Sequence, residues 1–329
     1  MISSTSSPVS PPSAPLPCGR YAPSPSGDLH LGNLRTALLA WMMARTAGGR
    51  FVMRVEDLDR VKKGAAERQL ADLAALGIDW DGEVLYQSTR LAAYADALTR
   101  LREAGLVYEC YCTRKEIQEA SSAPHGAPGA YPGTCRNLTE AERAERRALR
   151  PASLRLKAQV SEWTVTDRFA GEYTDTVDDF VLVRADGVYA YNLVCVVDDD
   201  YQGVTEVVRG DDLLPSAPRQ AYLAHLLGLQ VPTYAHVPLA LNVEGKRLAK
   251  RDGAVTLAEL TAAGASTDHI MRMIAASIPL PPLTGASAGE AGPHLPETAA
   301  EMLSVFSPDR IKQAPWTVVD PLLESTCGL

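Results

Sequence analysis

The order of elements in residues 19–55 constrains the fold of this chain more than any other feature of its sequence. A short strand is predicted at residues 19–22, and a helix over residues 33–45 follows a loop that contains Pro and Gly. The next segment, "FVMRVEDLDR", has the alternation typical of a strand. Strand, loop, helix and strand make a βαβ unit, and predicted helices over 64–76 and 89–103 continue the alternation. We therefore predict an α/β fold with a parallel sheet.

Length and composition indicate a globular protein of two or three domains. The chain has 329 residues, of which 46% are apolar, and its longest apolar runs are too short to span a membrane. The net charge of −8 argues against a broad basic surface for nucleic acid but allows a local basic groove. Residues 1–17 are rich in Ser and Pro and lack the features of a signal peptide, so we expect a disordered tail and a cytoplasmic protein.

The pattern of the chain changes between residues 106 and 150. This stretch holds three of the six cysteines, a loop rich in Pro and Gly, and a charged helix with Thr139 as its expected cap. Such an interruption of an α/β pattern indicates an inserted subdomain. Later segments predict a helix that starts at Pro218 and, beyond residue 257, helices interrupted by a loop over 279–297. Further strands are predicted at 153–157, 180–184 and 188–197, and within "GVTEVVRGDDLL" and "HVPLALN".

The loop that precedes the first predicted helix is suited to bind a phosphate group. Its sequence, "SPSGDLHLGN" at residues 24–33, places glycines and a histidine before the helix N-terminus. Unpaired N–H groups and the positive end of the helix dipole attract anions there, and glycine lets a phosphate approach the backbone. His30 adds a titratable donor. For this segment taken alone, an ordinary βα turn with an incidental histidine is the alternative interpretation.

A second loop, "GKRLAKRDG" at residues 245–253, places four cations in six positions between two glycines. A solvated surface loop also tolerates such a run, so the signal is weak by itself. The two loops together are what an enzyme needs to activate a carboxylate with ATP. One side would seat adenine and the α-phosphate, and the other would hold the departing pyrophosphate.

These loops resemble the two signatures of class I aminoacyl-tRNA synthetases. "HLGN" resembles the HIGH signature and "RLAKR" the KMSKS signature, although Arg247 stands where Lys is usual and Ala249 where Ser is usual. Those departures keep Lys250 but would weaken loop closure. More narrowly, "GRYAPSPSGDLHLGNLRTAL", "RVEDLDR", "VVDDDYQGVTEVVRGDDLL" and "AKRDGA" resemble glutamyl-tRNA synthetases, in order, from about residue 19 to 260. The resemblance implies catalytic roles for His30 and Lys250, and ATP binding by Pro23, His30, Gly32, Asn33 and Lys250.

The same resemblance implies a pocket for glutamate. Glutamate carries two carboxylates and an ammonium, so its pocket needs planar cationic forks, an anionic partner and a hydroxyl. Arg209 and Arg20 are expected to face the side-chain carboxylate, and Glu56 the α-ammonium. Cys195 stands where full-length glutamyl enzymes usually have asparagine, which predicts weaker glutamate binding. The residues implied around the amino acid are Arg20, Ala22, Ser24, Glu56, Tyr191 and Arg209.

Cys110, Cys112 and Cys135 form a Cys-x-Cys pair followed by a distant third thiol. Structural zinc takes four ligands in a tetrahedron, so a fourth ligand is missing from the thiols. Chemistry alone nominates His125, because imidazole is a common zinc ligand. The resemblance implies Tyr131 instead, because a short class of glutamyl-like synthetases has a zinc site with Cys-x-Cys and Tyr-x3-Cys here, and "YPGTC" fits. Three buried thiols without a metal are the other interpretation.

The chain is short for a glutamyl-tRNA synthetase, because only 79 residues follow Lys250 and the large helical anticodon-binding region needs more. This truncation, the cysteine motif and "AYNL" before "VVDD" make it similar to the glutamyl-Q tRNA(Asp) synthetase family. In that family glutamate is adenylated without tRNA and then transferred to the queuosine base at the wobble position of tRNA(Asp). We expect a Rossmann-type parallel-sheet catalytic domain, an inserted zinc-bearing, acceptor-binding subdomain and a short helical C-terminal region. The expected boundaries are a tail at 1–17, catalytic halves at 18–105 and 188–245, the insert at 106–187, and the Lys-rich loop with the C-terminal region at 246–329.

The expected reaction has two steps. The glutamate carboxylate attacks the α-phosphate of ATP in line, while His30, the helix N-terminus and Lys250 stabilise charge on the phosphates, together with Mg²⁺. A hydroxyl of the nucleoside then attacks the mixed anhydride, and no covalent enzyme nucleophile is expected. We expect a monomer whose partners are ATP, L-glutamate and queuosine-bearing tRNA(Asp), with no membrane association.

Three other functions are compatible with some of these patterns. The first is glutamyl-tRNA synthetase activity with an anticodon-binding partner in trans, for which activation would need tRNA(Glu). The second is a small-molecule nucleotidyltransferase, which would not need two arginines and Glu56. The third is a non-catalytic, zinc-bearing RNA-binding module, against which His30, Lys250 and the acidic net charge all argue.

Overall fold

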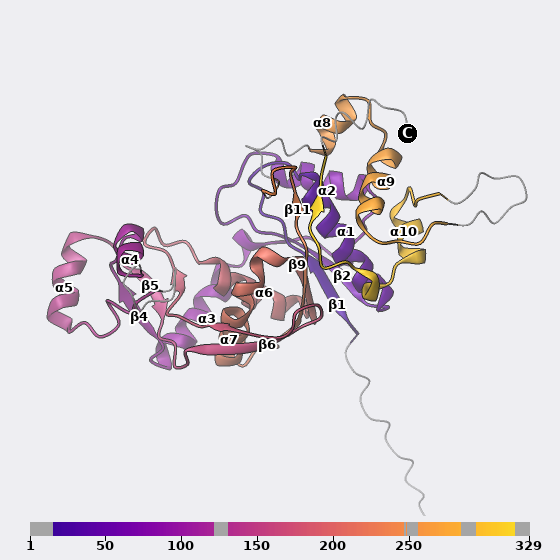
Figure 1. Ribbon diagram of the computed structural model, residues 1–329. Helices are drawn as coiled ribbons and strands as arrows, with labels where there is room; N and C mark the ends of the chain where they lie inside the picture. The colour runs from indigo at the N-terminus through magenta and orange to yellow at the C-terminus, as the bar shows by residue number, and fades with distance from the viewer. Residues whose placement is uncertain (1–15, 122–130, 247, 249–255, 284–293, 320–329) are drawn as a thin grey trace, which may run out of the picture.

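The predicted βαβ unit opens the fold in the computed structural model of the chain (Figure 1). It consists of β1 (Cys18–Tyr21), α1 (Leu31–Thr46) and β2 (Arg50–Val55). β1 pairs in parallel with β2, and β2 pairs in parallel with the short β3 (Leu85–Tyr86). The α/β arrangement with a parallel sheet is therefore confirmed. The structure describes residues 16–121, 131–246, 248, 256–283 and 294–319.

Further strands continue the sheet on the other side of β1. β9 (Glu206–Gly210) lies beside β1, since the N–H of Thr205 donates to the Cys18 carbonyl at 2.9 Å. β10 (Thr233–Val237) pairs in parallel with β9, and β6 (Glu162–Asp167) pairs in parallel with β10. The carboxyl ends of these strands consequently face one edge of the sheet, which is where open α/β sheets bind their ligands.

α1 lies at the centre of the largest hydrophobic core. Twelve of its sixteen residues are buried, including Leu34, Leu38 and Met42. A helix that is apolar on all sides has to be covered on all sides, and here the sheet lies on one side and C-terminal helices lie on another. The packing against β1 is close: a Cβ added at Gly19 would lie 2.9 Å from the Ala44 Cβ.

The segment 188–197, predicted as a strand, is largely helical, so this prediction was wrong. α6 spans Tyr191–Gln202, and only the residues that lead into it are extended. Valines favour a strand by propensity, and a short apolar run does not distinguish a buried strand from a buried helix. The helix is favoured here because it buries Asp198 and Asp199 beside basic and hydroxyl partners on the same side as the apolar residues.

The other helices of this part agree closely with their predicted positions. The N-terminus of α7 has Pro218 in its first turn, where the missing N–H removes no intrahelical hydrogen bond. Short 3-10 helices lie before α3 and α7. The bounds are α2 (Ala65–Ala75), η1 (Gln87–Thr89), α3 (Leu91–Glu103), η2 (Asp211–Ser216) and α7 (Ala217–Leu227).

A smaller unit with its own antiparallel sheet projects from one end of the molecule (Figure 1). Its strands are paired in the order β4-β5-β8. Thr139 caps α5 in a capping box with Glu142, as its position before the charged helix predicted. Within the expected insert, the hairpin of β6 and β7 extends the sheet of β9 and β10 instead of this small sheet. The bounds are β4 (Val107–Cys110), α4 (Arg114–Ser121), α5 (Glu140–Leu149), β5 (Ser153–Leu156), β7 (Gly171–Thr176) and β8 (Val181–Val183).

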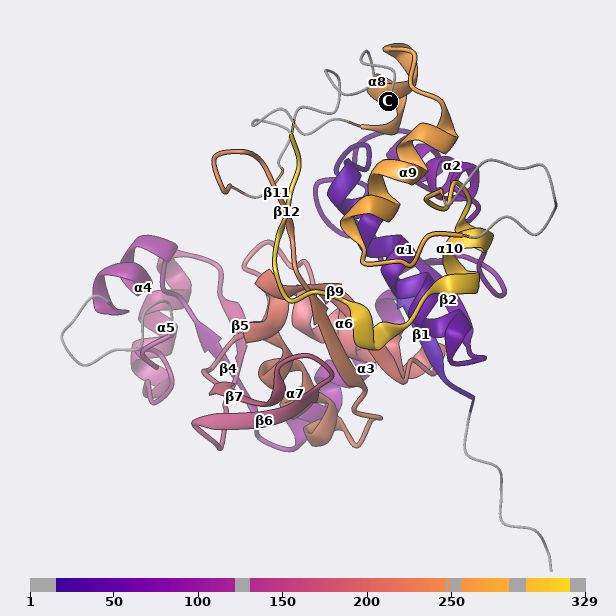
Figure 2. The ribbon, with the colours of Figure 1, turned by 45° about the vertical axis from the view of Figure 1, so that its right-hand side comes forward.

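The described parts of the C-terminal region contain the helices α8, α9 and α10, as predicted, and their buried residues pack against α1. The strand predicted in "HVPLALN" is split at Pro238, so that β10 ends before it and β11 follows it. β11 pairs in parallel with the late β12, and the two lie side by side in Figure 2. No helix in the described ranges is long and apolar enough to cross a membrane. The bounds are β11 (Ala240–Leu241), α8 (Leu257–Ala262), α9 (Thr267–Ser277), α10 (Ala299–Val305), η4 (Pro308–Arg310) and β12 (Trp316–Thr317).

Candidate active site

His30 lies at the junction between the first loop and α1, as its N-cap residue. Its Nδ1 accepts a hydrogen bond from the Asn33 N–H (3.3 Å), and the Asn33 Oδ1 accepts one from the His30 N–H (3.2 Å). This capping box fixes the direction in which the chain enters the helix. Because Nδ1 is an acceptor, the neutral ring carries its proton on Nε2 and is a donor on that side. The ring and the first turn of α1 thus offer donors for an anion.

Gly32 allows α1 to pack closely at this N-terminus. A Cβ at this position would lie 3.0 Å from the Ala240 Cβ and 3.2 Å from the His30 ring. A larger residue would therefore displace either β11 or the ring, which explains why glycine is needed here even though its φ angle is unremarkable.

The second, basic loop begins and ends beside the same helix terminus. Leu248 is buried, and its N–H donates to the Ala240 carbonyl at 3.3 Å. Thr256, after the loop, forms a β-bridge with His30. The two loops are therefore neighbours at their described ends. The predicted loop residues themselves lie outside the described part of the chain: Arg247, Ala249 and Lys250.

The segment between β1 and α1 connects the two predicted halves of the site. The Pro23 carbonyl accepts a hydrogen bond from the Glu56 N–H (3.0 Å), so the first loop is fixed to the end of β2. Ala22 is half-buried beside it. Ser24 is exposed, and its carbonyl accepts a hydrogen bond from the Gln69 side chain (3.1 Å). Backbone contacts thus hold this segment against both β2 and α2.

Arg20 lies in a buried network of charges on β1, β2 and α6. Its Nε lies 3.4 Å from Asp199 Oδ1, and one Nη donates to the Val208 carbonyl (3.3 Å). Arg54 donates to the same Asp199 oxygen at 2.8 Å. Burial alone would raise the pKa of Asp199, but the guanidiniums of Arg54 and Arg20 lower it below its ordinary value. The carboxylate therefore stays ionised between two cations.

Glu56 faces this network from the end of β2. Its Oε1 lies 3.6 Å from an Nη of Arg54 and accepts a hydrogen bond from the Cys195 thiol (3.2 Å). Burial raises the pKa of Glu56, and the charge of Arg54 opposes that effect. Burial and the neighbouring Glu56 raise the pKa of Cys195 well above its ordinary value, so this thiol remains protonated and donates. A buried carboxylate with such a weak donor is suited to bind an ammonium group.

Arg209, at the end of β9, is held by neutral partners. Its Nε donates to His236 Nε2 (2.9 Å), and one Nη donates to Gln220 Oε1 (2.7 Å). The same Nη lies 3.4 Å from the Tyr191 hydroxyl, and the other Nη donates to the Leu213 carbonyl (3.3 Å). Tyr191 is 38% exposed, so this hydroxyl lies where the buried network meets solvent. The arrangement offers a guanidinium and a hydroxyl to a carboxylate.

Arg20 and Glu56 thus belong to one network through Asp199 and Arg54, and Arg209 and Tyr191 form a second contact nearby, between β9 and α6. Tyr191 and Cys195 lie one turn apart on α6, and Cys195 contacts Glu56. The sequence reasoning missed other buried polar residues that support these contacts. A signal in the sequence was available for two of them, because Arg54 lies in the motif "RVEDLDR" and Asp199 in "VVDDD". These motifs supported the resemblance, but neither residue was given a role of its own. The missed residues are Arg54, Asp167, Asp199, Gln220 and His236.

The three clustered cysteines come together in the small unit, close enough to hold a metal ion. The sulfurs of Cys110, Cys112 and Cys135 lie within 4.8 Å of one another. The Tyr131 hydroxyl lies 3.3 Å from the Cys110 sulfur and 3.6 Å from the Cys112 sulfur, and it accepts a hydrogen bond from the Cys135 N–H (2.9 Å). Its oxygen is therefore placed as a fourth donor atom would be. His125, the alternative ligand, lies outside the described residues.

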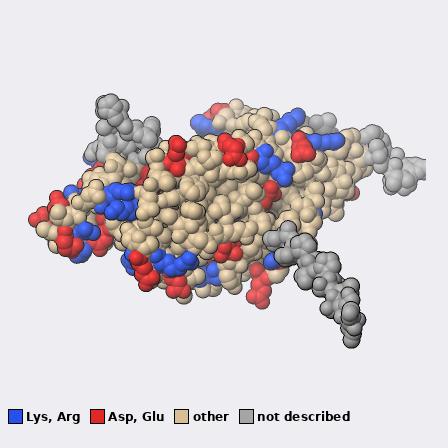
Figure 3. Space-filling view, turned by 90° about the horizontal axis from the view of Figure 1, so that it is seen from below, with Lys and Arg blue, Asp and Glu red and all other residues tan. Residues whose placement is uncertain are grey.

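The surface of the small unit carries charges of both signs. Figure 3 shows blue and red side chains crowded at the end of the molecule that carries α4 and α5. Several of them are paired, for example Arg147 with Glu109 (2.7 Å) and Arg150 with Glu116 (3.1 Å). The arginines of this surface are thus partly balanced by neighbouring carboxylates.

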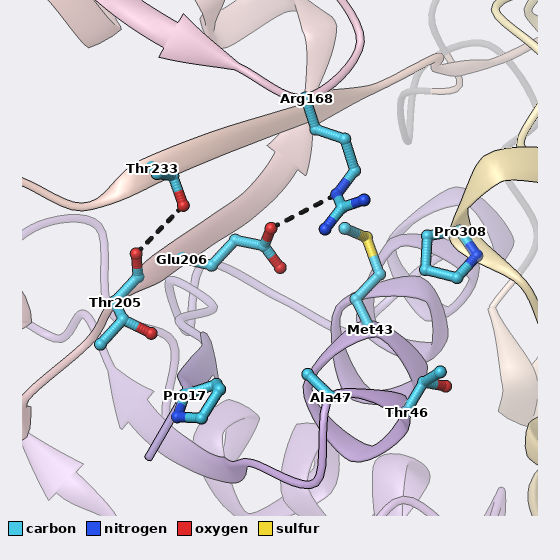
Figure 4. A pocket seen from close by; sticks show the side chains of 9 residues that line it. All are labelled: Pro17, Met43, Thr46, Ala47, Arg168, Thr205, Glu206, Thr233 and Pro308. Atoms are coloured by element: carbon cyan, nitrogen blue, oxygen red, sulfur yellow. Dashed lines mark hydrogen bonds and ion pairs between the residues drawn. The ribbon is translucent and has the colours of Figure 1, made fainter. Parts of the chain in front are cut away.

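A cavity of about 500 Å³ lies at the opposite end of α1 from His30 (Figure 4). Met43 and Ala47 from the C-terminal end of the helix line it, and Arg168 reaches across it to Glu206 (3.5 Å). Because α1 has 16 residues, this cavity lies roughly 20 Å from the capping histidine. It is not part of the candidate active site.

A family model identifies the class of protein that this fold and site define. Residues 18–277 match the catalytic domain of the class I tRNA synthetases for E and Q, that is, for glutamate and glutamine. A glutamate tRNA ligase of Elizabethkingia meningosepticum, solved in complex with its amino acid, superposes with a TM-score of 0.74 at 25% identity. The superposition covers 94% of this chain and 68% of that one.

Curated relatives narrow the class further. A glutamyl-Q tRNA(Asp) synthetase of Nocardia farcinica is 60% identical over 303 residues, which cover 92% of this chain and 93% of that protein. A protein of the same name from Symbiobacterium thermophilum is 50% identical over 275 residues, which cover 78% of this chain and 85% of that protein. The chain belongs to the glutamyl-Q tRNA(Asp) synthetase family, within the class I synthetases.

Proposed function

We propose that this protein activates glutamate with ATP in the absence of tRNA and transfers it to the queuosine base of tRNA(Asp). One observation carries the proposal: the segment after β1 connects the buried charges around Arg20 and Glu56 with the N-terminus of α1, whose N–H groups attract anions. β1 places Arg20 among the buried charges, and the loop after it ends at His30. The hydrogen bond between Pro23 and Glu56 holds the two parts together. Adenylation requires this arrangement, because a carboxylate oxygen has to reach the α-phosphate.

The activation step uses groups that are already oriented. Arg209 and the Tyr191 hydroxyl hold the side-chain carboxylate of glutamate, and Glu56 holds its ammonium group. The free α-carboxylate attacks the α-phosphate, a new oxygen–phosphorus bond forms, and pyrophosphate leaves. His30 Nε2–H and the N–H groups of the first turn of α1 stabilise the phosphate charge, together with Lys250. Mg²⁺ bound with ATP would neutralise further charge on the leaving pyrophosphate.

The transfer step would place the acceptor nucleoside over the same pocket. A hydroxyl of queuosine attacks the carbonyl of the glutamyl-adenylate, and AMP leaves. We infer that the unit formed by β4, β5, β8, α4 and α5 contacts the acceptor RNA as an inserted subdomain, which its position at one end of the molecule and its arginine-bearing surface support. We propose that the protein acts as a monomer in the cytoplasm, where ATP and tRNA occur.

We also propose that zinc binds Cys110, Cys112, Cys135 and Tyr131. Three thiolates with one oxygen donor provide the four ligands of a structural site. The donor set fits, because the Cys135 N–H that reaches the Tyr131 oxygen would stabilise a phenolate there. The guanidinium of Arg155 lies 3.8 Å from the centre of the Tyr131 ring, which favours negative charge on that side chain. The metal would hold β4 and the loop before α5 together.

Exchange of labelled pyrophosphate into ATP tests the activation step. Glutamate alone should support exchange without tRNA, whereas aspartate and glutamine should not. His30→Ala and Lys250→Ala should each reduce it by about 100-fold or more, as removal of one preorganised charge-stabilising donor does. Exchange that starts only after addition of tRNA(Glu) would instead indicate an ordinary glutamyl-tRNA synthetase activity. A complete absence of exchange under all of these conditions would support a non-catalytic binding module.

The acceptor is tested separately with labelled glutamate and two preparations of tRNA(Asp), one bearing queuosine and one bearing guanosine at the wobble position. Only the queuosine-bearing tRNA should become labelled, and the label should be lost when the modified base is removed. Equal labelling of both preparations would refute the proposed acceptor while leaving the activation step intact.

A further inference from the structure

Three buried side chains form a line across three adjacent strands behind the amino-acid pocket. Asp167 ends β6, His236 lies on β10 and Arg209 lies on β9. The His236 Nδ1 lies 2.6 Å from Asp167 Oδ2, and the His236 Nε2 lies 2.9 Å from Arg209 Nε. Asp167, His236 and Arg209 are 2%, 3% and 6% exposed.

The direction of every hydrogen bond in this line is determined by its members. The guanidinium Nε–H of Arg209 can only donate, so the His236 Nε2 has to accept. The ring proton is therefore on Nδ1, where it points at the Asp167 carboxylate. A histidine in this arrangement is neutral, because a proton on Nε2 would face a positively charged donor.

Hydrogen bonds also fix the orientation of the Asp167 carboxylate. Its Oδ1 accepts from the N–H groups of Phe169 and Ala170 (both 2.9 Å), and its Oδ2 also accepts from the His236 N–H (3.0 Å). A carboxylate with four donors has one orientation. The imidazole therefore acts as a rigid acceptor built into the sheet.

This acceptor decides which edge of Arg209 is presented to a ligand. With Nε on His236, one Nη on Gln220 and Tyr191, and the other on Leu213, four of the five N–H groups are engaged by described residues. The remaining N–H belongs to the second Nη, and the edge that carries Nε–H is already engaged by His236. Without the imidazole, the Arg209 side chain could rotate, and the guanidinium would no longer present one fixed edge to a ligand.

We propose that His236, held by Asp167, is a positioning residue that aims Arg209 at the side-chain carboxylate of glutamate. The inference rests on the proposed function, since it concerns how the same pocket recognises its amino acid. His236 does not touch the substrate; it acts through Arg209. It therefore affects the binding of glutamate and leaves the binding of ATP at the other side of the site unaffected.

The test compares His236→Leu, which removes the acceptor, with His236→Gln, whose amide oxygen can accept from the Arg209 Nε–H. In pyrophosphate exchange, His236→Leu should raise the KM for glutamate by about 10-fold to 100-fold, as the loss of one charge-assisted hydrogen bond does. The KM for ATP should change by less than about twofold, and His236→Gln should recover most of the glutamate affinity.

A control variant, destabilised by a substitution outside the site, distinguishes the loss of Arg209 positioning from a general loss of stability. Leu227→Ala, in the buried C-terminal turn of α7, should lower the melting temperature without a change in either KM. An unchanged KM for glutamate in a folded His236→Leu variant would overturn the inference. An equal rise of both KM values would do the same. A wild-type protein that shows no glutamate-dependent exchange would overturn the proposed function itself, which is a different result.

Discussion

The buried pair of Arg54 and Asp199 allows a direct test of how the charges of the pocket affect stability. We choose Asp199→Asn, which keeps the size of the side chain and one acceptor oxygen but removes the charge. The Arg54 side chain is wholly buried and Asp199 is 12% exposed, and Arg20 depends on the same carboxylate. Loss of one partner of a buried pair costs about 3–5 kcal/mol, because it leaves an uncompensated charge in the interior. Since asparagine still accepts a hydrogen bond and Glu56 remains 3.6 Å from Arg54, we expect a loss at the lower end, about 3 kcal/mol.

The matched control is Asp186→Asn, at the turn after β8. Asp186 contacts Arg184 at 2.6 Å, but the two side chains are 51% and 41% exposed. A surface pair of this kind contributes about 0–1 kcal/mol. Equilibrium unfolding in urea, followed by tryptophan fluorescence, should therefore give a clearly lower midpoint for Asp199→Asn and a small change for Asp186→Asn. Equal losses in the two variants would refute the reasoning from buried charge.

Four further predictions concern the site and its supports. Tyr131→Phe should release zinc from the purified protein, as measured by metal analysis, whereas His125→Ala should retain it; the reverse pattern would assign the fourth ligand to His125. Cys195→Asn should lower the KM for glutamate by about fivefold, because an amide is a stronger hydrogen-bonding group than a thiol at Glu56; a higher KM would refute this. Gly19→Ala should destabilise the fold by about 1–3 kcal/mol in urea unfolding, with partial rescue by Ala44→Gly. Burial lowers the pKa of His236 below its ordinary value of 6.5, so at a pH below 6.5 the unfolded chain binds more protons at this residue than the folded chain does. The free energy of unfolding should therefore fall as the pH is lowered from 6.5. An equal fall in the His236→Gln variant would exclude this histidine as the cause.

The elements near the N-terminus were predictable because local pattern and tertiary burial agree there. The alternation of residues 51–55 and the loop before α1 each indicated one structure, and both were found. The strand prediction for residues 188–197 was wrong because local pattern and tertiary burial disagree there. The valines favour a strand, whereas the burial of Asp198 and Asp199 against α3 and β2 favours a helix. Burial of a charge depends on distant partners, and a single sequence does not show them.

The candidate site divides in the same way. Residues inside recognisable motifs, such as His30 and Glu56, were nominated from the sequence. His236 and Asp167 were not, because these two residues are 69 positions apart in the chain and their strands meet only in the sheet. A histidine on a strand has no spacing that distinguishes a support for Arg209 from an ordinary core residue.

The charges of the pocket suggest why it would accept glutamate and reject glutamine. Arg20 and Arg54 lie against the carboxylates of Asp199 and Glu56, whereas the buried Arg209 has neutral partners. A neutral His236 stands between Arg209 and the further carboxylate of Asp167. The uncharged ring separates Asp167 from Arg209, so the described residues place no carboxylate in direct contact with this buried guanidinium, and a carboxylate of a ligand would balance its charge. Glutamate, with two carboxylates and one ammonium, brings one net negative charge, whereas glutamine brings none. Discrimination would then arise at Arg209, because glutamate can place a carboxylate against this guanidinium and glutamine cannot.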